Sequence, residues 1–120
     1  MSPLTYTPFV TKPLFKVAGE IKTPPFSEAA RVEAGALLRE LQEGQSLGMP
    51  DSRPMPAIGP GCHELRITDE TTIHRVFYAI RPDAIVLLAT LTKKTTATPP
   101  EMIRTCAGRI RRYDEARKGR

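Results

Sequence analysis

A chain of 120 residues is the size of one domain, and its 40% apolar residues are enough to form a hydrophobic core. Its formal net charge of +5 favours an anionic partner such as nucleic acid. No apolar run is long enough to span a membrane and no signal-peptide layout is present, which predicts a cytoplasmic protein without a membrane partner. Cys62 and Cys106 lack the spacing of metal ligands, so we expect buried thiols, no metal and no cofactor.

The N-terminal third of the chain predicts one strand and one helix. Residues 1–11 are rich in Pro and Thr and are expected to be loosely ordered, so that a single domain would span residues 12–120. Residues 12–17 alternate as in a strand. A helix is expected from Ser27, with Ser27 or Thr23 as its cap, to a stop at Gly44. Its buried stripe comprises Ala30, Ala34, Leu37, Leu38 and Leu41.

Residues 45–61 are rich in Pro and Gly and predict a long surface loop. The only base of this loop is Arg53, which we interpret either as a solvated charge or as a contact to RNA. Three strands should follow, at residues 63–68, 72–80 and 84–93. Because the last of these is apolar on both faces, we expect it in the middle of the sheet.

The C-terminal segment predicts a helix, with Thr98 as its cap, Pro99 in its first turn and Glu101 completing a capping box. Several basic residues lie outside its apolar stripe, and Arg109 and Arg112 are the candidates for RNA contacts. The stripe comprises Ile103, Cys106, Ala107, Ile110 and Tyr113.

Two arginines in the hairpin of residues 63–80 are predicted to be direct neighbours. Alternation places Glu64, Arg66, Arg75 and Phe77 on one face, which we expect to be open. An even-numbered connection puts Arg66 opposite Arg75 and Glu64 opposite Phe77, whereas a slip of one residue would bury an arginine. The core face then comprises Leu65, Ile67, Val76, Tyr78 and Ile80. The arginines form either a solvated cluster with Glu64 or an anion site.

The third strand favours the anion site. If a two-residue loop precedes it, Arg75 pairs with Thr90, and Lys94 comes onto the face of Arg66 and Arg75. Lys93 would have the opposite parity, although it lies at the strand end and can reach round. Three cations from three strands would thus converge.

The motifs "HELR", "HRVFY" and "VLLATLTKKTTATP" resemble the RelE/ParE toxin superfamily, and most of all its HigB-like phage-associated branch. The resemblance runs from about Lys12 to Tyr113. It implies an α+β fold, in which an N-terminal helix packs on a small antiparallel sheet of about four strands that a C-terminal helix follows. It also implies the toxin of a type II toxin–antitoxin pair that cleaves mRNA on the ribosome. The basic cleft of the family corresponds here to Arg66, Arg75, Lys93 and Lys94.

The sequence departs from the motifs of that branch at several positions. The strand histidine is Ala89, the aromatic residue after it is Leu91, and the lysine before the final Thr-Pro is Ala97. The aromatic residues before "ELR" and "RVFY" are His63 and His74. These differences bear on which group moves protons.

Metal-independent RNA cleavage by the 2′-hydroxyl needs a base, cations that stabilise the phosphorane, and an acid. Arg66 and Arg75 suit the second role, because planar guanidinium groups match phosphate oxygens. The candidates for proton transfer are Glu64, Lys93, Lys94, His63 and His74. Strand parity directs both histidines toward the core, where a structural role is expected.

The resemblance implies a cognate antitoxin, of the helix-turn-helix type, together with mRNA and the ribosome as partners. Operator DNA would be bound only through the antitoxin complex. An alternative is a relative that acts by binding without cleavage, either a ParE-like gyrase inhibitor or an inactive phage-derived RNA-binding adaptor. A plain basic RNA-binding module is a third interpretation.

Overall fold

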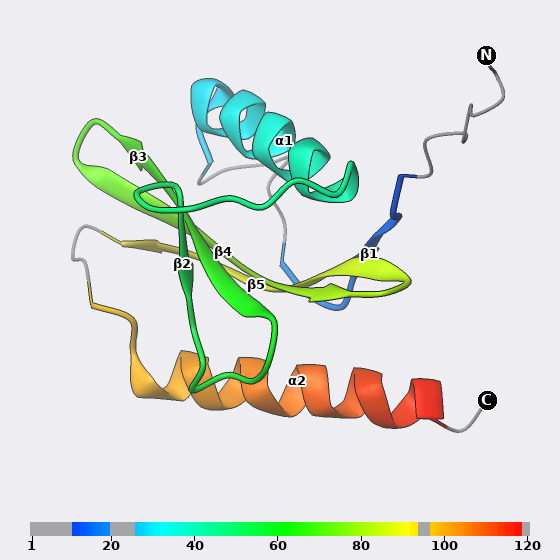
Figure 1. Cartoon of the computed structure of the whole chain (residues 1–120). Coiled ribbons are helices and arrows are strands. Elements are labelled where there is room, and N and C mark those ends of the chain that lie inside the picture. Colours follow the sequence, from blue (N-terminus) through cyan, green and yellow to red (C-terminus); the bar gives the residue numbers. More distant parts are fainter. Residues whose placement is uncertain (1–10, 20–25, 94–96, 119–120) are drawn as a thin grey trace, which may run out of the picture.

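The computed structural model describes residues 11–19, 26–93 and 97–118. Helix α1 (Glu28–Gln42) covers one face of a five-stranded sheet and helix α2 (Pro100–Lys118) covers the other, so that the predicted α+β class is confirmed (Figure 1). The strands are β1 (Leu14–Lys16), β2 (Ser52–Pro54), β3 (Cys62–Asp69), β4 (Thr72–Arg81) and β5 (Ala84–Lys93). Within the described ranges, no helix has the length and apolar character needed to cross a membrane. Residues 1–10 of the segment expected to be loosely ordered lie outside these ranges.

The sheet has the order β1-β5-β4-β3-β2 and is mixed, which corrects the expectation of about four antiparallel strands. Strand β1 pairs parallel with β5, with Leu14 opposite Ile85, and the other pairs are antiparallel. Strand β5 lies inside the sheet, as its two apolar faces predicted. Strand β2 lies within residues 45–61, which were predicted as a loop. The sequence did not indicate this strand, because three residues that end in a proline are too few to show alternation.

Helix α1 forms as its sequence predicts. The Ser27 hydroxyl accepts a hydrogen bond from the backbone N–H of Ala30 at 3.1 Å, which confirms Ser27 as the cap. Gly44, with φ of +91°, occupies the left-handed conformation that ends the helix. Its buried residues are Ala30, Ala34, Leu38 and Leu41, and they pack on the β3 and β4 residues of the predicted core face.

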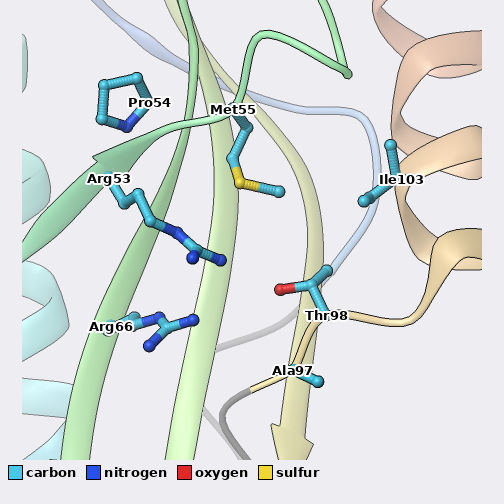
Figure 2. A pocket seen from close by; sticks show the side chains of 7 residues that line it. All are labelled: Arg53, Pro54, Met55, Arg66, Ala97, Thr98 and Ile103. Carbon is cyan, nitrogen blue, oxygen red and sulfur yellow. The ribbon is translucent and has the colours of Figure 1, made fainter.

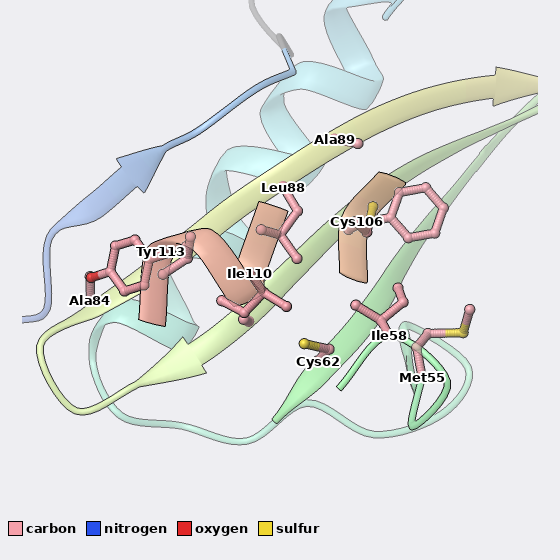
Figure 3. Packing of buried hydrophobic residues seen from close by; sticks show 12 residues of the cluster. Met55, Ile58, Cys62, Ala84, Leu88, Ala89, Cys106, Ile110 and Tyr113 are labelled. Atoms are coloured by element: carbon pink, nitrogen blue, oxygen red, sulfur yellow. The ribbon is translucent and has the colours of Figure 1, made fainter. Parts of the chain in front are cut away.

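The second face of the sheet is not open. Phe77 and Arg75 are 0% exposed there, so the prediction that this face meets solvent was wrong. This face is covered because the apolar stripe of α2 packs against the apolar residues that β4 and β5 present on it. Figure 3 shows Cys106, Ile110 and Tyr113 of α2 over this surface.

A paired charge fastens α2 to the end of β4. The Arg81 guanidinium donates from Nε and Nη2 to the two carboxylate oxygens of Asp114, both at 2.9 Å. The hydrogen bond from Arg81 lowers the pKa of the Asp114 carboxyl against the smaller opposing effect of burial. Arg81 also donates from Nη1 to the backbone oxygen of Pro60, so one side chain joins a strand, a helix and a loop.

A β-bulge changes the predicted register of β5. Arg75 lies opposite Leu91 and not Thr90, because the pairing shifts by one residue between Phe77 and Tyr78. Between the loop and the bulge, from Arg81 opposite Ala84 to Tyr78 opposite Leu87, the register is the one that a two-residue loop predicts. After the shift, Lys93 has the parity of Arg75, which corrects the opposite parity expected for it.

Both cysteines are free and buried in the core beneath α2. Burial raises the pKa of the Cys62 thiol above its ordinary value and that of Cys106 to about 11. At pH 8 such a pKa leaves roughly 0.1% of Cys106 as thiolate. We therefore expect neither thiol to react rapidly with an aromatic disulfide reagent until urea unfolds the protein. Fast stoichiometric release of thiolate from the native protein, measured by absorbance, would contradict this.

Candidate functional site

The two arginines of the hairpin are cross-strand neighbours. Arg66 on β3 lies directly opposite Arg75 on β4, and Glu64 lies opposite Phe77, which confirms the predicted register. Like charges facing each other across a sheet are destabilising unless a counter-charge lies between them. Glu64, two residues before Arg66 on the same face, supplies this counter-charge.

The Glu64 carboxylate is fully buried and holds four groups from four segments. Its Oε1 accepts from Arg66 Nε at 2.8 Å and from Arg53 Nη2 at 2.9 Å. Its Oε2 accepts from the Thr98 hydroxyl at 2.5 Å and lies 3.2 Å from Arg75 Nε. The network thus joins β2, β3, β4 and the segment that leads into α2.

These contacts keep Glu64 ionised. Burial alone would raise its pKa, but the hydrogen bonds from Thr98 and Arg66 and the charges of Arg66 and Arg53 outweigh burial and lower it. The pKa of the Arg75 guanidinium is lowered, chiefly by its burial and against the attraction of Glu64. Three guanidinium groups against one carboxylate leave two positive charges in the cluster.

A pocket of about 510 Å³ opens beside this cluster (Figure 2). Arg53 and Arg66 form one wall of the pocket, while Arg75 and Glu64 are not among the lining residues. The residues that line it are Arg53, Pro54, Met55, Arg66, Ala97, Thr98 and Ile103. Guanidinium groups converging on one side of a pocket can bind a phosphate through several charge-assisted hydrogen bonds.

The candidates for proton transfer lie in different places. Lys93 is exposed at the end of β5, opposite Ile73, and Lys94 lies outside the described residues. His74 is buried on the α1 face, where it stacks on Phe26 and its Nδ1 lies 2.9 Å from the Thr92 hydroxyl. This placement matches the structural role expected for His74.

His63 lies near the start of β3, between Pro54 of β2 and Tyr78 of β4, and is partly buried. Its ring stacks on Tyr78 with centroids 5.3 Å apart, and its Nδ1 lies 3.2 Å from the Gly61 oxygen. Neither histidine lines the arginine pocket. Glu64, in turn, has its oxygens occupied by donors, which suits a group that positions arginines better than one that removes a proton.

The two arginines of α2 have different roles in the structure. Arg109 donates from Nη1 to the backbone oxygen of Leu88 at 2.7 Å, and Leu88 is the residue without a partner in the bulge of β5. Arg112 is exposed. The Arg109 guanidinium, expected to contact RNA, therefore also has a structural contact, because it donates to the residue that the bulge leaves without a cross-strand partner.

We expect Arg109→Met to lower the free energy of unfolding by about 1–3 kcal/mol, because the buried Leu88 oxygen loses its donor. The matched control is Arg112→Met on the exposed side of the same helix, which should change stability by no more than about 0.5 kcal/mol. Urea unfolding followed by circular dichroism measures both. Equal stability of the two variants would rule out the structural role of Arg109.

Of the seven lining residues, sequence reasoning proposed only Arg53 and Arg66 for the site and missed the other five. Thr98 was expected to cap α2, but the helix begins at Pro100 and the Thr98 hydroxyl donates to Glu64, 34 residues away. Figure 2 shows Ile103 across the pocket from the two arginines, and Met55 beside the guanidinium group of Arg53. Only the proximity of Arg53 to Pro54 and Met55 in the sequence could have pointed to this place, and no local pattern gives the distance between Met55 and Ile103.

Comparison with known proteins gives one match. The family model described as "Phage derived protein Gp49-like (DUF891)" matches residues 24–111, which is most of the chain and includes both hairpin arginines. No curated protein and no solved structure matches the chain.

Proposed function

This chain belongs to the phage-derived Gp49-like family, a family of RelE/HigB-like toxins, and we propose that it is a ribosome-dependent endoribonuclease that cleaves mRNA without a metal ion. Membership of a toxin family also indicates an antitoxin partner. We propose that this antitoxin is of the helix-turn-helix type, that mRNA and the ribosome are the further partners, and that operator DNA is bound only through the antitoxin complex.

The observation that carries this proposal is the arginine wall of the pocket. Arg53 and Arg66 are held in place by a buried carboxylate and still line an open pocket. Preorganised donors of this kind stabilise the charge that develops on a phosphorane, because they need no rearrangement during the reaction. The net positive charge of the cluster attracts the RNA backbone to the same place.

We assign the steps as follows. Arg66 and Arg53 bind the oxygens of the scissile phosphate, and the buried Arg75, which contacts Glu64, adds positive charge to the cluster. Glu64 positions the arginines. Lys93 or Lys94 takes the proton of the 2′-hydroxyl and returns one to the leaving 5′-oxygen.

The test is cleavage in a translating extract. Purified protein, freed of antitoxin, should produce new 5′ ends within mRNA, mapped by primer extension, and should produce few of them when ribosomes are omitted. Intact mRNA at saturating protein concentration would contradict the proposal.

A second candidate is a toxin relative that acts by binding without cleavage. The residues that line the pocket favour it, because among them arginine and threonine are the only polar side chains, and neither is a typical general base. Such a protein would inhibit gyrase or serve as a phage-derived RNA-binding adaptor. Expression that induces the DNA-damage response while mRNA remains intact would favour this candidate over the nuclease.

A further inference from the structure

The pocket beside the arginines has two chemically different walls. The rest of its lining includes apolar side chains: Ile103 lies across the pocket from Arg53 and Arg66, and Met55 and Pro54 lie beside Arg53 (Figure 2). Binding of a phosphate alone requires the cations and gains nothing from thioether and alkyl groups in the same pocket. The apolar wall therefore indicates a ligand with an anionic part and a flat apolar part.

We propose that this pocket takes one unpaired nucleotide of RNA, with its phosphate on Arg53 and Arg66 and its base between Met55 and Ile103. The inference rests on the proposed function for the identity of the nucleic acid. A volume of about 510 Å³ lies within the range of roughly 300–1,000 Å³ typical of small-ligand pockets, which a single nucleotide fits. A base in a duplex is stacked and paired, so only a single-stranded one can enter.

The apolar wall is held by the fold. The backbone N–H of Met55 donates to the Cys62 oxygen at 2.8 Å, the Met55 oxygen accepts from the N–H of Ile58 at 2.9 Å, and Met55 is 7% exposed. Ile103 lies in the first turn of α2 and packs against the core beneath that helix. Two such side chains keep their separation when the pocket is empty, which lowers the entropic cost of holding a base.

Thr98 joins the two walls. Its hydroxyl is bonded to Glu64, and its position in the pocket lies between the arginines and Ile103 (Figure 2). Ala97 beside it contributes only a methyl group to the lining. The structure therefore assigns specificity for the bound base to Met55 and Ile103, and retention of the phosphate to the arginines.

The test measures binding without cleavage. A fluorescent 2′-O-methyl hexaribonucleotide, which lacks the attacking hydroxyl, is titrated with protein at fixed salt to measure its affinity. The same titration is made with a set of these oligonucleotides that each have one abasic position. Loss of the base that occupies the pocket should weaken binding about 5-fold or more, which is the lower end of the range for a base stacked on an aromatic side chain, because Met55 and Ile103 offer thioether and alkyl contacts instead. The other abasic positions should have smaller effects.

Two variants then locate the base. Ile103→Ala should weaken binding of the intact oligonucleotide several-fold and leave binding of the sensitive abasic one unchanged, since the lost contact is to the base. The control is Val32→Ala, at an exposed position of α1, which should change neither affinity. Ile103→Trp, which fills the pocket, should weaken binding of the intact oligonucleotide as much as removal of the base does. Melting curves establish that each variant is folded.

Equal binding of the intact and abasic oligonucleotides would overturn the inference. So would the absence of detectable binding to either. So would an Ile103→Ala variant that weakens both equally. These outcomes are separable from failure of the proposed nuclease, because they do not depend on cleavage. If the protein cleaves mRNA in the extract but its binding does not depend on the base, the proposed nuclease activity stands and the proposed base pocket is contradicted.

Discussion

The Glu64→Gln variant is expected to lose about 3–5 kcal/mol of unfolding free energy, which is the usual cost of removing one partner from a buried ion pair. The carboxamide has one acceptor oxygen where the carboxylate has two, and its NH2 group would face guanidinium donors. Arg75 would remain buried beside Arg66 without the negative charge that separates them. Urea unfolding of the two proteins at pH 7 gives the difference.

Glu33→Gln is the matched control for this prediction. Glu33 is exposed on α1, so the same chemical change there should alter stability by no more than about 0.5 kcal/mol. If Glu64→Gln resembled this control, the Glu64 network would contribute no more than a surface ion pair.

The same carboxylate makes stability depend on pH. Because the pKa of Glu64 is lower in the folded protein than its ordinary value of 4.5, its contribution is complete above that value and is lost as the pH falls through the lower folded pKa. The difference in unfolding free energy between the parent and Glu64→Gln should therefore shrink as the pH is lowered below about 4.5. Asp114, whose pKa is also lowered, is present in both proteins and cancels. A constant difference from pH 7 to pH 3 would contradict this assignment.

Arg66→Ala is expected to reduce mRNA cleavage about 10²- to 10³-fold, the effect of removing one preorganised donor from a developing oxyanion. The Arg66 side chain is 22% exposed and lines the pocket, so its loss should affect the reaction more than the fold. Primer extension over time in the translating extract measures the rate. Growth on induced expression should recover in the same variant.

Two further variants sharpen this result. Arg66→Lys keeps the charge but loses the planar fork, and we expect it to recover only a small part of the rate. Arg39→Ala removes an exposed arginine from α1, away from the pocket, and should cleave like the parent. If Arg66→Ala cleaved like the Arg39 control, the arginine wall would not be where the phosphate is held.

Several features of the fold followed from local patterns. The stripes of α1 and α2 repeat at helical spacing, so the residues that they bury could be read along the chain. The position of Arg66 opposite Arg75 followed from alternation, because a shift of one residue would exchange the two faces of the strand. Both predictions depend only on residues close in sequence and on the burial of apolar side chains.

The candidate site was decided by contacts between distant segments. Alternation could not show that α2 would cover the face of Arg75, or that Thr98 would meet Glu64 across 34 residues. Nor could it show the bulge at Leu88, which moves Lys93 onto the arginine face.

The sequence by itself thus determined the two helices, the hairpin register and the pairing of the two arginines. Only the tertiary structure decided that one buried carboxylate holds three arginines and that a two-walled pocket opens beside them. The physical reason is that periodicity reports which side of an element is apolar. It does not report which segments meet there, because that depends on how α2 and the loop around β2 pack against the sheet.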